Sequence, residues 1–143
     1  MADEKIRLRI VTPLRMLYDD FVDMVIIRGT EGDMGVLPGH EVRSTMLGYG
    51  VLKFRKDGQE AVLSVLGGFA EINKTAVTIL SEAAEWPEDI DEVRALAAKE
   101  RAEMRMKQHT ENLDSKRAEH SLRRALVRIE VSTYPIIKDS LTK

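Results

Sequence analysis

Glycine is confined to one part of this chain, and that distribution constrains the fold more than any other feature of the sequence. All nine glycines lie between Gly29 and Gly68, and the 75 residues that follow contain none. Glycine serves turns and bulges, whereas it destabilises a helix interior by about 1 kcal/mol. The distribution therefore predicts a turn-rich first part and a largely helical last part. Pro87, directly after Trp86, marks the boundary between them.

Short alternating or β-branched runs indicate strands throughout the first part. In residues 5–10 apolar and charged side chains alternate, which places Ile6, Leu8 and Ile10 on one face of a strand. Asp57-Gly58 predicts a tight hairpin turn. We expect further strands at 22–27, 50–55, 61–66 (ended by Gly67-Gly68), 69–72 and 76–80, with a second hairpin turn at 73–75. Because no helical stretch separates them, these strands predict an antiparallel β-sandwich or barrel over residues 1–86.

Two amphipathic segments predict an antiparallel helical hairpin over residues 87–143. Asp89 followed by Glu92 resembles a capping box, so we expect the first helix to start there. Residues 108–112 are polar and predict a loop, and the second helix is expected over about 115–131. The expected apolar faces are Ile90, Val93, Ala97 and Met104 on the first helix, and Ala118, Leu122, Ala125, Leu126 and Ile129 on the second. Both faces are thin, so the hairpin needs a surface to dock on and can exchange between docked and detached states.

The composition excludes several functional classes. Lys and Arg number 22 against 24 Asp and Glu, and this balance argues against nonspecific nucleic-acid binding. The absence of cysteine removes disulfides, thiolate metal sites and a thiol nucleophile. The three histidines lack ligand spacing, Asp19-Asp20 is interpreted as a solvated turn, and no phosphate-binding loop or nucleophile elbow is present. We therefore expect a cytoplasmic protein that neither inserts into a membrane nor contains a metal or catalytic centre.

Arginines form the most informative pattern on the two predicted helices. At about 100° per residue, Arg94 and Arg101 share one line on the first helix. The second helix has such a line as well, made of Arg117, Arg124 and Arg128. If the hairpin closes, four arginines converge into a cluster that suits a polyphosphate or a row of carboxylates. The same spacing also fits a solvated basic face with intrahelical pairs such as Glu119 with Arg123, and it leaves both interpretations open.

An ordered set of motifs resembles the epsilon subunit of F-type ATP synthases. The motifs are residues 31–40 (EGDMGVLPGH), 67–72 (GGFAEI), 77–80 (VTIL), 84–85 followed by 89–95 (DIDEVRA), and 118–119 and 124–125 with Arg128. They run in the expected order from about Ile6 to Val131. The resemblance implies a β-sandwich followed by a helical hairpin. It also implies a non-catalytic rotor subunit at the cytoplasmic face of the cell membrane, peripheral and part of the ATP synthase complex.

The resemblance also implies partners. In the family the sandwich sits at the foot of the central stalk, against the gamma subunit and the ring of membrane c subunits. Glu31, Asp33 and His40 are the implied contacts. The hairpin folds beside the sandwich or extends along gamma into the alpha/beta catalytic head, where it inhibits ATP hydrolysis. We expect the basic residues of the second helix to meet acidic groups there: Lys116, Arg117, Arg123, Arg124 and Arg128.

Some bacterial members of this family bind ATP in the folded hairpin through an Ile-Asp-x-x-Arg-Ala motif, which here spans residues 90–95. The implied ATP contacts are Ile90, Asp91, Arg94, Ala95, Arg101, Arg124 and Arg128. No cofactor is required, and ATP is expected as a regulatory ligand. A free-standing ATP-sensing module is the alternative function, which co-purification with gamma distinguishes from a rotor subunit. A small β-sandwich enzyme is the third possible function, but the sequence offers no catalytic group for it.

Overall fold

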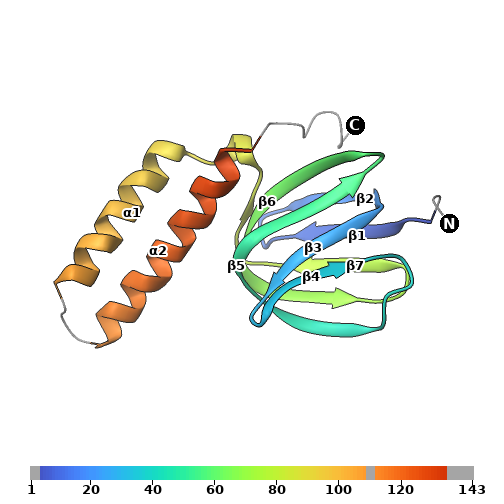
Figure 1. The fold of residues 1–143 in the computed structure, drawn as a ribbon, viewed down its shortest axis with the longest axis horizontal. Coiled ribbons are helices and arrows are strands. Elements are labelled where there is room, and N and C mark those ends of the chain that lie inside the picture. The colour runs from blue at the N-terminus through green and yellow to red at the C-terminus, as the bar shows by residue number, and fades with distance from the viewer. Residues whose placement is uncertain (1–3, 109–111, 135–143) are drawn as a thin grey trace.

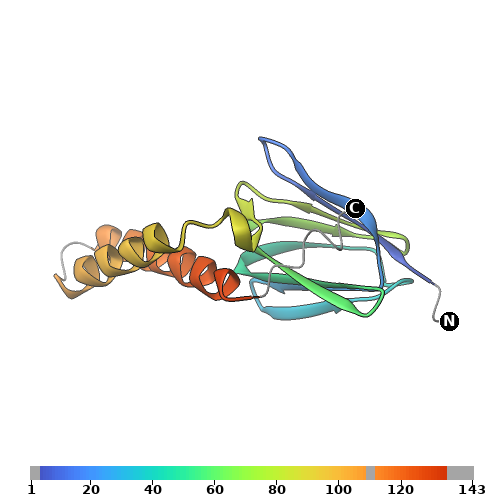
Figure 2. The same ribbon diagram turned by 90° about the horizontal axis from the view of Figure 1, so that it is seen from above.

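The computed structural model describes residues 4–108 and 112–134, which form a β-sandwich followed by two helices (Figure 1). The strands follow one hydrogen-bonded path in the order β2-β1-β7-β6-β5-β3-β4, with β8 paired to β6. This path folds over into two facing layers (Figure 2), as the sequence predicts. The prediction of purely antiparallel pairing is wrong at one place, because β1 and β7 run parallel. The strands are β1 (Ile6–Val11), β2 (Met16–Val22), β3 (Met24–Gly29), β4 (Gly32–Val36), β5 (Arg43–Lys56), β6 (Gln59–Ile72), β7 (Ala76–Leu80) and β8 (Ala84–Glu85).

The core of the sandwich forms as the alternating pattern predicts. Ile6, Leu8 and Ile10 are each 0% exposed. Three aromatic rings pack together within this core: Tyr18, Phe54 and Trp86 lie with ring centroids 4.6–6.3 Å apart. Burial raises the pKa of the Tyr18 hydroxyl well above its usual range. Because these contacts involve no residue of the two helices, the sandwich has a hydrophobic core of its own.

The structure corrects the prediction for residues 19–27. The run 22–27 is not one strand, because the chain turns at Asp23 between β2 and β3. Asp19 and Asp20 lie inside β2 rather than in a turn, with Asp19 exposed and Asp20 half-buried. Ion pairing explains the difference, since Arg7 donates to Asp19 at 2.8 Å and Lys56 donates to Asp20. These cations hold the pKa of both carboxyl groups below the usual range, so that each stays charged within a strand.

The two longest strands, β5 and β6, pair over nearly their whole length. The predicted turn joins them, with Asp57 at φ 52° and Gly58 at φ 80°. The expected end of the strand at Gly67-Gly68 is wrong: β6 continues to Ile72. These two glycines take φ values of 78° and 110°, so the strand bends there without ending. The turn at 73–75 forms as predicted and leads into β7.

The helical part begins with the short 3-10 helix η1 (Pro87–Asp89), followed by α1 (Glu92–Lys107) and α2 (Asn112–Ser132). The predicted cap is wrong by two residues. Asp91 caps α1 and accepts a hydrogen bond from the Arg94 backbone nitrogen at 3.0 Å, because η1 takes up Asp89. The expected loop begins at Gln108, and residues 109–111 lie outside the described residues. The second helix starts three residues earlier than predicted.

The buried face of α1 also differs from the prediction. Val93 and Met104 are exposed, whereas Ala95 and Ala102 are the buried residues. On α2 the predicted Ala118 and Ala125 are buried, while Leu126 is 44% exposed and Leu122 and Ile129 are half-buried. Small side chains on both helices allow a close approach, so alanines rather than larger apolar residues form the buried stripe.

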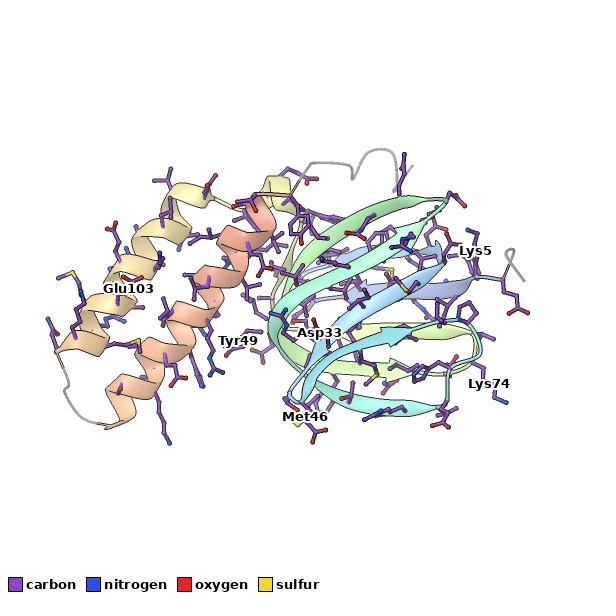
Figure 3. All side chains as sticks on the ribbon, viewed as in Figure 1. Lys5, Asp33, Met46, Tyr49, Lys74 and Glu103 are labelled. Atoms are coloured by element: carbon purple, nitrogen blue, oxygen red, sulfur yellow. The ribbon has the colours of Figure 1, made fainter. Side chains whose placement is uncertain are left out.

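The hairpin docks on the sandwich through α2, which lies between α1 and the strands (Figure 1). Val127 and Val131 of α2 and Ile90, which precedes α1, form a small second apolar cluster with three residues of the sandwich: Val51, Val62 and Leu66. Tyr49 of β5 lies on the side of the sandwich nearest the helices (Figure 3), with its ring centroid 5.9 Å from that of His120. The docking surface is therefore small compared with the core of the sandwich.

Candidate functional site

A cavity of about 460 Å³ lies where the two helices meet the last strand of the sandwich. Both helices and the segment that connects them to the strands contribute to it. Its lining consists of Glu85, Asp89, Asp91, Arg94, Ala95, Ala98, Arg101, Ala102, Arg105, Ser121, Arg124, Ala125 and Arg128. The many alanines leave room between the helices that larger side chains would fill.

Helical periodicity explains how α1 supplies its share of the lining. Arg94, Arg101 and Arg105 are spaced by seven and four residues, which returns each to the same side of the helix. Ala98 and Ala102 lie between them and keep the space open. The first helix therefore presents three guanidinium groups over a floor of small residues.

Two further arginines come from α2, four residues apart. The Arg124 guanidinium donates to the Ser121 hydroxyl at 3.3 Å, a local contact that orients it along the cavity wall. Arg128 donates from its Nε to Oε1 of Glu85 at 2.6 Å and so connects α2 to the sandwich. Both side chains are half-buried rather than fully solvated.

The charge of the lining determines what it can hold. Five arginines and three carboxylates give an excess of two positive charges. One carboxylate, Asp91, is already occupied by its capping bond to the α1 backbone, and a second, Glu85, by Arg128. Guanidinium groups form paired hydrogen bonds to phosphate and carboxylate oxygens. The cavity therefore suits an anion with several oxygens.

The structure brings most of the predicted ligand set together. Asp91, Arg94, Ala95, Arg101, Arg124 and Arg128 all line the one cavity. Ile90 does not, because it is buried in the apolar cluster under α2. Arg117, which shares the line of Arg124 in the sequence, is exposed and lies outside the lining. The four-residue step from Arg101 was a signal for Arg105, which sequence reasoning missed. No periodic signal marks Glu85, since it comes from a strand.

Residues 31–40, the expected docking segment, form the β3–β4 turn, β4 and the loop after it. Glu31 is exposed at the turn, and Asp33 accepts a hydrogen bond from Arg28 Nε at 3.0 Å. The His40 ring nitrogen Nδ1 lies 2.9 Å from the Glu41 carbonyl oxygen. Leu37 within this segment is 56% exposed, so the surface combines polar groups with an exposed apolar side chain.

The basic residues of α2 divide into two groups. Lys116, Arg117 and Arg123 are exposed, and Arg123 donates to Glu119 at 2.9 Å. Arg124 and Arg128 instead face the cavity. In this docked form the five residues expected to contact acidic groups of the catalytic head are therefore not on one surface.

Two kinds of feature are absent from the part of the chain that the structure describes. Within residues 4–108 and 112–134, no group of three or more His, Asp or Glu side chains is placed to hold a metal ion. Over the same ranges, no helix is long and apolar enough to cross a membrane. His109, one of the three histidines, is outside the described residues.

Comparison with known sequences gives matches to two domain families in order along the chain. Residues 5–87 match the family described as "ATP synthase, Delta/Epsilon chain, beta-sandwich domain". Residues 88–133 match "ATP synthase, Delta/Epsilon chain, long alpha-helix domain". The ATP synthase epsilon chain of Bacillus velezensis is 44% identical over 127 residues, which cover 89% of this chain and 96% of that protein. That of Halalkalibacterium halodurans is 45% identical over 128 residues, with the same coverage.

Solved structures agree with the sequence matches. A chain in the cryo-EM structure of the Euglena gracilis mitochondrial ATP synthase (OSCP/F1/c-ring, rotational state 1) superposes with a TM-score of 0.80 at 26% identity. The match covers 94% of this chain and 84% of that one. A chain of the Tetrahymena thermophila central stalk/c-ring structure shares the fold at 12% identity and a TM-score of 0.61. On these matches, the chain belongs to the delta/epsilon family of ATP synthase subunits and resembles its bacterial epsilon chains.

Proposed function

We propose that this chain is a non-catalytic subunit of the central stalk of a bacterial F-type ATP synthase, peripheral to the cell membrane at its cytoplasmic face. The observation that carries the proposal is the ordered match of both domain families over residues 5–133. Supporting it, the described residues contain an independent sandwich core and a separately docked helical pair. In the rotor, the sandwich anchors the chain and the helices regulate ATP hydrolysis.

The proposed partners of the sandwich are the gamma subunit and the c ring. The docking segment offers the exposed Glu31 and Asp33 and the half-buried His40 near the exposed side chain of Leu37. Such a mixed surface is typical of a protein–protein contact. Co-expression with the gamma subunit of the same organism tests this assignment. A rotor subunit co-purifies with gamma in a fixed ratio, whereas a free-standing ATP-sensing module elutes alone.

The helices are proposed to regulate hydrolysis by leaving the sandwich and entering the alpha/beta catalytic head. The small apolar docking cluster supports this, because elements held by few apolar contacts separate at low free-energy cost. After detachment, Arg124 and Arg128 leave the cavity and join the exposed basic residues of α2. We expect that surface to meet acidic groups of the head in contacts that weaken with salt.

ATP is the proposed ligand of the arginine cavity, and its binding favours the docked helices. The five arginines converge only when α1 and α2 lie together, so a polyphosphate stabilises that state selectively. A ligand present at one hundred times its dissociation constant adds about 2.7 kcal/mol to the state it binds. That is enough to shift a marginal docking equilibrium by about a hundredfold.

Isothermal titration with ATP and ADP tests the ligand. Arg124→Ala removes a guanidinium that lines the cavity, and a charge-assisted hydrogen bond contributes about 1.5–3 kcal/mol. We therefore expect ATP affinity to fall at least tenfold. Arg123→Ala is the matched control, because this neighbouring arginine is exposed and pairs with Glu119. The ATP affinity of Arg123→Ala should stay within twofold of that of the wild type. ADP should bind more weakly than ATP. Negligible heats for the wild type at millimolar ATP would contradict the proposed ligand.

A further inference from the structure

The ion pair between Glu85 and Arg128 lies where the sandwich, α2 and the cavity meet. Arg128 Nε and Glu85 Oε1 are 2.6 Å apart, and the two residues are 43 positions apart in sequence. Their side chains are 33% and 30% exposed, so both charges are partly removed from solvent. The pair therefore joins the helical part to the sandwich, and breaking it costs about as much as losing one partly exposed ion pair.

The strand that carries Glu85 holds its carboxylate in a fixed place. β8 pairs with β6 through Ala84 and Glu85, and the Ser64 hydroxyl donates to the Glu85 carbonyl oxygen at 3.4 Å. The next residue, Trp86, is 2% exposed in the core. On the other side of the pair, Val127 is buried against the sandwich. Glu85 therefore belongs to the sandwich, and Arg128 reaches it from the part of α2 that packs on the sandwich.

The guanidinium of Arg128 serves two surfaces at once. It holds Glu85, and it lines the cavity together with Arg94, Arg101, Arg105 and Arg124. Glu85 occupies the Nε donor of Arg128, so a polyphosphate that binds the guanidinium through its Nε edge competes with Glu85 for that donor. Because a phosphate oxygen and a carboxylate oxygen accept the same type of hydrogen bond, one can replace the other.

We propose that Glu85 is the built-in counter-anion of the arginine cavity: it pins α2 to the sandwich through Arg128 while the cavity is empty, and a bound polyphosphate takes Arg128 over from it. The first half is a property of the chain alone. The second half rests on the proposed ligand. Docking is then held by two alternative anions, one internal and one bound, that share a single arginine.

The absence of cysteine from the sequence makes the docking equilibrium directly measurable. Lys74→Cys and Lys107→Cys introduce two labelling sites, at the end of the sandwich far from the helices (Figure 3) and near the end of α1. Single-molecule energy transfer between the two dyes reports whether the helices rest on the sandwich. The variants are Glu85→Gln, Arg128→Gln and both together. The matched control is Glu82→Gln, which makes the same charge change at an exposed position three residues away.

Without ligand, we expect Glu85→Gln and Arg128→Gln each to lower the docking equilibrium constant roughly two- to fivefold, the range of one partly exposed ion pair. The double variant should lose no more than the larger single loss, since both changes remove the same contact. Glu82→Gln should match the wild type. Thermal unfolding of the sandwich should be the same in all of them. Wild-type docking in Glu85→Gln, or additive losses in the double variant, would overturn the proposal that Glu85 pins α2 to the sandwich through Arg128.

Inorganic tripolyphosphate, which has no base or sugar, tests the transfer of Arg128. At saturation we expect Glu85→Gln to dock as fully as the wild type, because the ligand now supplies the anion. Arg128→Gln should stay below both. If tripolyphosphate binds Glu85→Gln without restoring docking, the transfer is wrong. If tripolyphosphate fails to bind the wild type, both the proposed polyphosphate ligand and the take-over of Arg128 are wrong. The comparison without ligand still decides whether Glu85 pins α2 to the sandwich.

Discussion

Gly68 is the position where one added methyl group should damage the sandwich most. Its φ of +110° is rarely adopted by residues with a side chain. A Cβ built there would lie 2.0 Å from the Leu80 carbonyl oxygen and 2.8 Å from the Ser81 Cα, both backbone atoms. Ser81 cannot retreat freely, because its amide donates to the Val11 carbonyl oxygen at 3.0 Å. An ordinary van der Waals contact at this Cβ is 3.4 Å or longer. Gly68→Ala therefore forces β6 and the end of β7 more than 1 Å further apart than they are in the native sandwich.

The cost follows from two contributions. The positive φ costs about 1–2 kcal/mol for a residue with a Cβ, and the overpacking adds about 1–3 kcal/mol. We expect Gly68→Ala to lower the free energy of unfolding by about 2–5 kcal/mol. For a chain of this size that corresponds to a fall in Tm of roughly 10–25 °C. Thermal and urea unfolding followed by circular dichroism measure both quantities.

Gly58→Ala provides the matched control. Gly58 also has a positive φ, of +80°, but nothing lies within 4 Å of the Cβ position. It should therefore lose only the backbone contribution of about 1–2 kcal/mol. If the two variants melted within about 3 °C of one another, the steric account of the bend at Gly68 would be refuted.

Two further predictions concern charged side chains. Asp33→Lys should weaken ion-coupled ATP synthesis in the reconstituted complex. The sandwich should stay folded, since the Asp33–Arg28 pair is exposed and contributes at most about 1 kcal/mol. Unchanged assembly and synthesis would show that Asp33 does not face the c ring. Lys56 lowers the pKa of Asp20, so the stabilisation from this carboxylate is complete above the ordinary carboxyl pKa of about 4 and is lost as the pH falls through the lower value in the folded chain. Asp20→Asn should thus be less stable at pH 7 and lose less stability between about pH 4 and pH 2, and urea midpoints that fall in parallel with the wild type would contradict this.

Local pattern was sufficient to predict most of the fold. Strict alternation identified β1, and Asp57-Gly58 identified the β5–β6 turn, because each signal depends only on neighbouring residues. The prediction for Asp19 and Asp20 was wrong because residues distant in the sequence determine where they lie. Asp19 and Asp20 sit in a strand because Arg7 and Lys56 neutralise them from other strands, and no local rule shows that.

The helices illustrate the same limit. Periodicity found four of the five arginines of the cavity, all but Arg105, since spacing along one helix determines which side each faces. It chose the wrong buried face for α1, because the prediction favoured the larger apolar Val93, whereas the small Ala95 and Ala102 are the buried residues. Glu85 was missed because its role depends on a contact between a strand and a helix 43 residues away.

The central claim is that the sandwich anchors the chain in the rotor while the helices restrain ATP hydrolysis. The most direct test is the ATP hydrolysis rate of the complex reconstituted with the full chain or with a chain that ends at Trp86. All residues of the main hydrophobic core lie at or before Trp86, so the shortened chain should fold and still bind gamma. We predict that the shortened chain assembles normally and that hydrolysis is faster than with the full chain. Equal hydrolysis rates in the two assembled complexes would contradict the account.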